Sequence, residues 1–242
     1  ATAMSLSLRA ILQKLSCGKV GATFERPQFL MLGLDQAGKT TLLYRLTGCS
    51  WPKDEIAHDM ESMRRWAWDP GPLPDASKEQ TQKYDGGYHY EEFGGLFPYT
   101  IWEVPGTQAM RRVWNIFYRS IKIHGVIFVV NADEKDETRL DLAKKNLHLL
   151  LNEDELRQAF FVVICNTRKK RSESSPLDME GREDEIVFRL GLHDLHHSCS
   201  WRVKKFSMNI MDISDQMDKT WVPVLEFARQ VLTSEQGFGM KL

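Results

Sequence analysis

Four residues in the first quarter of the chain have the types and spacing of a phosphate-binding loop. Gly33, Gly38, Lys39 and Thr40 fit the pattern Gly-x-x-x-x-Gly-Lys-Ser/Thr. Glycines let the backbone wrap around a phosphate with its N–H groups pointing inward, and the following helix directs the positive end of its dipole at the same charge. In such loops the lysine bridges the β- and γ-phosphates and the threonine hydroxyl holds Mg²⁺.

The flanking segments are the ones that this loop requires. An apolar run at 29–32 predicts a buried strand before it, and apolar residues at helical spacing in 42–46 predict a helix after it. A match placed directly between a strand and a helix is seldom accidental. We expect nucleotide contacts at Gly33, Asp35, Gln36, Ala37, Gly38, Lys39, Thr40 and Thr41.

Apolar strands and amphipathic helices alternate along the rest of the chain. Strands are expected at 99–104, 125–130, 160–165 and 203–207, and helices at 110–121, 140–151, 184–190 and 221–232. This alternation predicts an α/β domain with a mostly parallel central sheet and helices on both faces.

The composition excludes several classes of protein. Of 242 residues, 42% are hydrophobic and 27% are charged, so the chain is neither largely disordered nor fibrous. The net charge of −1 does not favour nucleic acid, and we expect no nucleic-acid partner. The four cysteines form no Cys-x-x-Cys pair and no apolar run could span a bilayer, which favours an intracellular protein with reduced thiols.

One main domain carries several additions. We expect an N-terminal extension at 1–25, a nucleotide-binding domain at 26–235 and a tail at 236–242, with an insert at about 51–87 and a charged, solvated loop at about 168–185. The insert is too long for a structureless loop inside a compact domain, so it is either functional or disordered, and its tryptophans argue against disorder.

The N-terminal extension reads as a basic amphipathic helix. Leu8, Ile11, Leu12 and Leu15 share one helical face, and no acidic residue precedes Glu25. Such a helix can lie on a membrane, dock on a partner, pack on its own domain or direct mitochondrial import. The expected location is therefore the cytoplasm or a membrane surface, with the mitochondrion as the alternative.

Aromatic residues in the insert indicate either a local core or an interface. Trp66, Trp68 and Met63 are residue types that also make interface hot spots. We expect protein partners to bind through the Trp51–Gly87 insert and the N-terminal helix.

Two motifs make the chain similar to a known family. Residues 33–43, GLDQAGKTTLL, resemble the first motif of the Arf-like branch of the Ras-type small GTPases, and 101–107, IWEVPGT, resembles its second switch, which normally reads Trp-Asp-Val-Gly-Gly-Gln. The similarity spans about 26–232 apart from the insert and the charged loop. It implies a P-loop small-GTPase fold that binds GTP or GDP with Mg²⁺, with Thr40 as a metal ligand and Glu103 acting through water.

The second switch differs from the family at the position of the residue that hydrolysis requires. The glutamine that orients the attacking water corresponds to Thr107, with Gln108 one place further on, and these are the candidate catalytic residues. Threonine is too short to reach that water. Pro105 replaces a glycine and fixes φ, whereas Gly106 is retained and its N–H is expected to contact a γ-phosphate. The implied GTPase is therefore slow or inactive.

The base-recognition motif departs further. Where the family reads Asn-Lys-x-Asp, this chain has Asn166, Thr167 and Lys169 at the matching positions, and a lysine cannot accept the hydrogen bonds of guanine. The following segment, usually Ser/Cys-Ala, is Ser207-Met208. These five residues remain the expected base contacts, and ATP or ADP stays open as an alternative to the guanine nucleotides.

The first switch is the least similar part. The family's threonine, which joins the Mg²⁺ shell, corresponds most nearly to Asp85, and Thr81 is an alternative. The insert enters at this position, where it either rebuilds an effector surface or holds the switch in one state.

Two functions follow from these observations. The departures at Pro105, Thr107 and Lys169 each damage a separate step of the GTPase cycle, which favours a pseudo-GTPase acting as a scaffold or structural subunit of a protein complex. The alternative is an active GTP/GDP switch that recruits effectors at a membrane surface.

Overall fold

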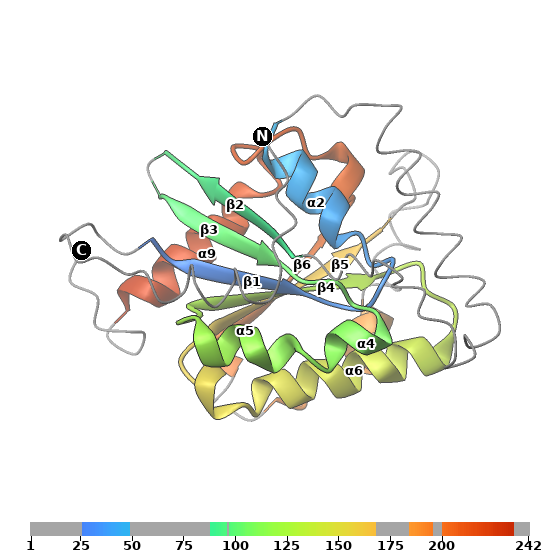
Figure 1. Ribbon diagram of the computed structural model, residues 1–242. Helices are drawn as coiled ribbons and strands as arrows, with labels where there is room; N and C mark the ends of the chain where they lie inside the picture. Colours follow the sequence, from blue (N-terminus) through green and yellow to red (C-terminus); the bar gives the residue numbers. More distant parts are fainter. Residues whose placement is uncertain (1–25, 49–87, 96, 168–183, 196–199, 235–242) are drawn as a thin grey trace, which may run out of the picture.

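The structure, a computed structural model, describes residues 26–48, 88–95, 97–167, 184–195 and 200–234. Within them a six-stranded sheet runs in the order β2-β3-β1-β4-β5-β6 (Figure 1). The predicted N-terminal helix, the insert, the tail and all but the end of the charged loop lie outside the described residues.

Five of the strands are parallel, and β2 at one edge pairs antiparallel with β3. The strands are β1 (Gln28–Leu32), β2 (His89–Phe93), β3 (Tyr99–Glu103), β4 (Gly125–Asn131), β5 (Phe160–Asn166) and β6 (Val203–Met208). Because the parallel strands end at the same edge, the loops that follow β1, β3, β5 and β6 gather there, which is where ligands bind in open α/β sheets.

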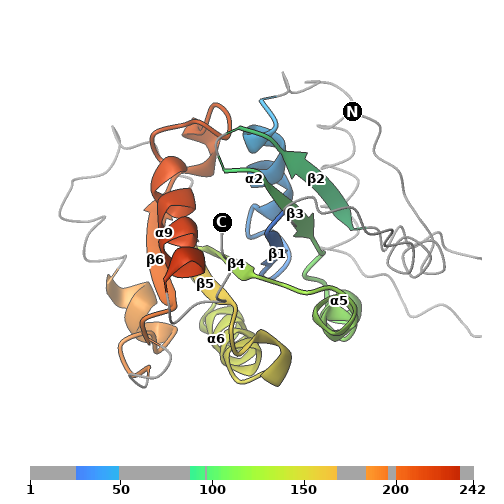
Figure 2. The same ribbon diagram turned by 90° about the vertical axis from the view of Figure 1, so that its left-hand side faces the viewer.

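Helices cover both faces of the sheet. They are α2 (Lys39–Leu46), α4 (Gln108–Arg111), α5 (Trp114–Ser120), α6 (Glu137–Leu151) and α9 (Val222–Thr233), with short 3-10 helices η1 (Asp154–Leu156) and η2 (Ile210–Asp212) and a further helical segment at 184–189. Figures 1 and 2 show α5 and α6 on one face and α2 and α9 on the other. None of the described helices combines the length and apolarity needed to cross a membrane.

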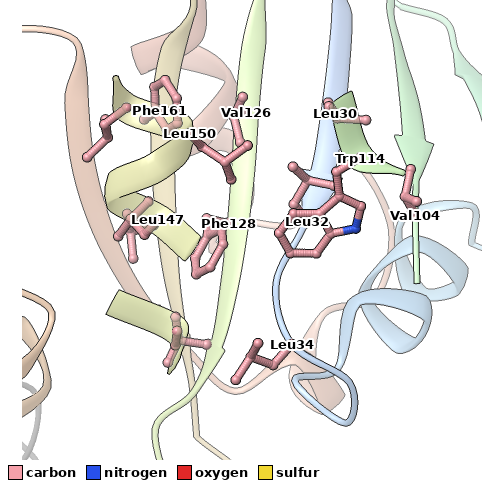
Figure 3. Close-up of a cluster of buried hydrophobic side chains, with 14 of the residues drawn as sticks. Leu30, Leu32, Leu34, Val104, Trp114, Val126, Phe128, Leu147, Leu150 and Phe161 are labelled. Atoms are coloured by element: carbon pink, nitrogen blue, oxygen red, sulfur yellow. The ribbon is translucent and has the colours of Figure 1, made fainter. Parts of the chain in front are cut away.

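Each face has its own apolar core. Leu30 and Leu32 of β1 pack with Trp114 and Leu147 under α5 and α6 (Figure 3), whereas Phe29 and Met31 belong to the core under α2 and α9. Successive residues of a strand point to opposite faces, so a continuous apolar run is what a strand buried on both sides needs. The predicted fold, a mostly parallel sheet with helices on both faces, is confirmed.

Two details differ from the sequence-based expectation. Strand β2 was not predicted, because its sequence HYEEF is polar and half exposed and has no apolar run. The helix expected over 110–121 is two helices, since a turn in which Val113 N–H bonds to Met110 O separates α4 from α5.

Candidate nucleotide-binding site

The loop between β1 and α2 has the backbone geometry of an anion cradle. Gly38, the N-cap of α2, has φ 102°, a left-handed conformation that favours glycine, and a Cβ there would lie 2.5 Å from Nδ2 of Asn166. Gln36 also has a positive φ, 60°. The first turn of α2 contains no acidic residue. Because the loop leads directly into the N-terminus of α2, the free N–H groups and the positive dipole end of this helix lie at the loop.

Lys39 is folded over this loop. Its Nζ donates to the carbonyl oxygens of Gly33 at 3.1 Å and Leu34 at 2.9 Å, and the residue is only 5% exposed. Burial lowers the pKa of Lys39, while the nearby carboxylates of Glu103 and Asp35 oppose this shift. A buried ammonium group at the start of α2 supplies the cationic partner that a bound phosphate needs.

Asn166, at the end of β5, ties the phosphate loop to the next segment of the site. Its Nδ2 donates to Ala37 O at 2.9 Å, and its Oδ1 accepts from Ile210 N at 3.3 Å. Thr167 N–H donates to Met208 O at 3.0 Å and joins the ends of β5 and β6. The predicted base-contact residues Asn166, Thr167, Ser207 and Met208 thus lie together at the carboxyl edge of the sheet.

The segment after β3 is held by side chains from the helices that follow. Arg111 Nη1 donates to Gly106 O at 2.6 Å, and Trp114 Nε1 donates to Pro105 O at 3.0 Å. The candidate catalytic residue Thr107 is the N-cap of α4, where its Oγ1 accepts a long bond, 3.4 Å, from Met110 N. Thr107 and Gln108 are both exposed.

Gly106 brings this segment into direct contact with the phosphate loop. A Cβ on Gly106 would overlap backbone atoms of Gly33, Leu34 and Asp35. The absence of a side chain is therefore what allows the two backbones to meet. The second switch and the phosphate loop form one packed unit in this conformation.

Glu103 ends β3 beside the loop and is paired across the sheet. Its Oε2 lies 2.6 Å from Nδ1 of His89, the first residue of β2, and the Glu103 side chain is only 3% exposed. The hydrogen bond that His89 makes to the Glu103 carboxylate raises the pKa of His89, and burial opposes that shift.

Arg139 of α6 reaches the loop from the other side. Its Nη2 donates to Asp35 O at 2.8 Å and lies 3.5 Å from Asp35 Oδ1, while its Nε donates to Glu134 at 2.9 Å. Burial lowers the pKa of Arg111, and Asp35 and Arg139 are both near enough to influence that pKa. Basic groups thus gather around Asp35.

The structure brings most of the predicted nucleotide contacts together. The loop from Gly33 to Thr41, Gly106 and the ends of β5 and β6 share one edge of the sheet, with Thr40 and Thr41 half-buried at the start of α2. Asp85, Thr81 and Lys169 lie outside the described residues.

Three residues at the site were not singled out for a role from the sequence. His89, Arg111 and Arg139 come from β2, α4 and α6, and no local spacing connects them with the loop. Had the hairpin of β2 and β3 been predicted, the polar residue opposite the end of β3 would have indicated His89. The sequence did not predict β2.

This arrangement defines the class of protein. A phosphate loop after the first strand of a mostly parallel sheet, with a switch-like segment after β3, is the α/β fold of the small GTPases. A sequence profile of the ADP-ribosylation factor (Arf) family matches residues 13–54 and 94–221. The chain belongs to this family of small GTP-binding proteins.

A solved structure has the same fold. The chain is similar to the Arl6 (BBS3) small GTPase from Trypanosoma brucei, a structure with the bound nucleotide analogue GppNp, with 20% sequence identity and a TM-score of 0.54. The match covers 85% of this chain and 99% of that one. The family profile leaves residues 55–93 unmatched, a range that includes most of the expected insert.

Arf-family proteins usually bind a guanine nucleotide with Mg²⁺, and the phosphate loop of this chain fits the phosphate part of such a ligand. The loop has a glycine where a side chain would collide, and it has a buried ammonium group. Among the described residues no group of three His, Cys, Asp or Glu side chains could hold a metal. A Mg²⁺ site made of one protein hydroxyl, phosphates and water requires no such group, and Thr40 would supply that hydroxyl.

Proposed function

We propose that the chain binds a guanine nucleotide through the phosphate loop, hydrolyses GTP slowly or not at all, and acts mainly as a scaffold or structural subunit of a larger assembly. Lys39 and the backbone of the loop would hold the phosphates. Thr40 would hold Mg²⁺, which neutralises phosphate charge when it is bound. Thr167, Ser207 and Met208 would lie at the base.

The observation that carries the proposal is the packed second switch. Arg111 and Trp114 bond to the carbonyl groups of Gly106 and Pro105, and Gly106 rests on the phosphate-loop backbone. Pro105 restricts the same segment further. Thr107, at the position of the family's catalytic glutamine, is a helix cap with a short side chain. A segment held in this way is suited to presenting the same surface to a partner whichever nucleotide is bound.

We also propose that the Trp51–Gly87 insert and the N-terminal helix bind the protein partners of that assembly. Peripheral membrane contact through the basic helix is compatible with this role, in the cytoplasm or, alternatively, in the mitochondrion.

Single-turnover hydrolysis tests the proposal. Protein preloaded with GTP and Mg²⁺ should release phosphate at about 10⁻⁴ s⁻¹ or more slowly, the range of small GTPases without a stimulating partner. Stimulation by a cell extract to about 1 s⁻¹ or faster would contradict the scaffold role and favour an active switch that recruits effectors at a membrane.

A further inference from the structure

His89 and Glu103 face each other at the edge of the nucleotide site. They are register partners in the antiparallel pair β2–β3, so their side chains lie on the same face of the sheet. Met31, next to the start of the phosphate loop, is the register partner of Glu103 on β1. Glu103 therefore lies beside the loop, and His89 lies one strand further out on β2.

The Glu103 carboxylate is buried, and a buried carboxylate needs partners. Lys39 is near enough for Glu103 to raise its pKa, but the Lys39 hydrogen bonds go to the carbonyl oxygens of Gly33 and Leu34. The close partner of Glu103 is His89, at 2.6 Å. The His89 ring lies 6.1 Å from the ring of Tyr44 on α2, between centroids.

The hydrogen bond between His89 and Glu103 bears on how strongly nucleotide binding depends on Mg²⁺. A carboxylate beside the phosphate loop repels phosphates when no metal lies between them. Glutamate has one more rotatable bond than aspartate, so an unheld Glu103 would sample more positions, including ones closer to the phosphates. The bond to His89 fixes one oxygen towards β2.

We propose that His89 is a positioning residue that holds the Glu103 carboxylate with or without Mg²⁺, so that nucleotide retention depends on Mg²⁺ less than it would if this carboxylate were free. The inference rests on the proposed nucleotide binding. It assigns a role to a residue on β2 that acts only through Glu103.

The release rate of N-methylanthraniloyl-GDP from the full chain, measured in Mg²⁺ and in excess EDTA, tests this role. The readout is the release rate in EDTA divided by the release rate in Mg²⁺. A structural change that weakens nucleotide binding equally in both conditions would leave this ratio unchanged. His89→Leu removes the donor, His89→Asn keeps a donor near the position of Nδ1, and Glu92→Gln changes a charge on the same strand away from Glu103. Melting curves check that each variant is folded.

The wild-type ratio should stay below about tenfold, and His89→Leu should raise it by about tenfold or more, the effect of losing one hydrogen bond to a charged group. His89→Asn should restore most of the difference, and Glu92→Gln should behave as the wild type.

Equal ratios in the wild type and a folded His89→Leu variant would overturn this inference alone. If the leucine variant does not fold, the wild-type ratio decides, and a value of about a hundredfold or more overturns the inference. A wild-type chain that binds no nucleotide in Mg²⁺ would overturn both this inference and the proposed function.

Discussion

In the described part of the chain, the buried side chains of Lys39 and Arg202 bond to backbone carbonyl groups. Lys39 donates to two carbonyl oxygens of the phosphate loop. Arg202, only 3% exposed, donates to the carbonyl oxygens of Leu151, Leu156 and Ala159 at 3.0, 2.9 and 2.8 Å. Because carbonyl groups at chain turns need donors when they are buried, one such side chain can satisfy several of them.

Replacing Arg202 with methionine should therefore destabilise the fold. The change keeps an apolar stem over the Phe161 ring, which lies 5.0 Å from the guanidinium, but leaves three carbonyl groups without their donor. We expect the free energy of unfolding in urea to fall by about 2–4 kcal/mol.

Arg157→Met is the matched control, because the side chain of Arg157 is 78% exposed and its ion pair with Asp154 lies on the surface. It should change the free energy of unfolding by less than about 0.5 kcal/mol. Similar losses in the two variants would contradict a special role for the Arg202 guanidinium.

The site was predictable from sequence where its residues lie in a recognisable motif, either the phosphate loop itself or a segment that resembles a motif of the family. Gly38, Lys39 and Thr40 lie in one motif, so their positions follow from spacing alone. His89 meets Glu103, and Arg139 meets the loop, through tertiary packing, which no local pattern records. In the sequence Arg202 is one of several basic residues close together, and no pattern there indicates that it is buried.

At the scale of elements, most of the predicted strands have apolar residues on both faces, and β6, which is only partly buried, is the exception. β1, β4 and β5 are buried throughout or nearly so, and their boundaries agree with the predicted runs within a residue or two. β2 has one solvent-facing side and polar residues, so its existence depended on the hairpin with β3. The break between α4 and α5 was not predicted because the apolar residues of both helices follow one continuous helical spacing in the sequence.

The insert lies between α2 and β2, and both elements have their own packing. Leu42 and Leu46 of α2 and Phe93 of β2 are buried in the core under α2 and α9. Replacing Trp51–Gly86 with a short Gly-Ser linker should therefore leave the melting temperature within about 5 °C of the wild type while association with partner proteins is lost. Thermal melting and co-purification from the native cell measure the two effects.

A comparable loss of stability and association would show that the insert is part of the core and not an interface. Intact association with intact stability would place the partners elsewhere on the chain.

At the scale of the whole molecule, two apolar cores on one sheet hold the loops after β1, β3, β5 and β6 at a single edge. The Arf-family profile covers both flanks of the insert. The central claim is that this edge still holds a nucleotide's phosphates although the switch and base motifs have diverged. It depends most on Lys39 and the loop that Lys39 closes.

The nucleotide content of the purified full chain, measured by denaturation and chromatography beside Lys39→Ala, tests this claim most directly. We expect about one guanine nucleotide per wild-type chain, almost none in Lys39→Ala, and wild-type content in Lys145→Ala, a change at an exposed site on α6. Equal content in the wild type and in a folded Lys39→Ala variant, or a wild-type chain purified in Mg²⁺ without nucleotide, would contradict the account.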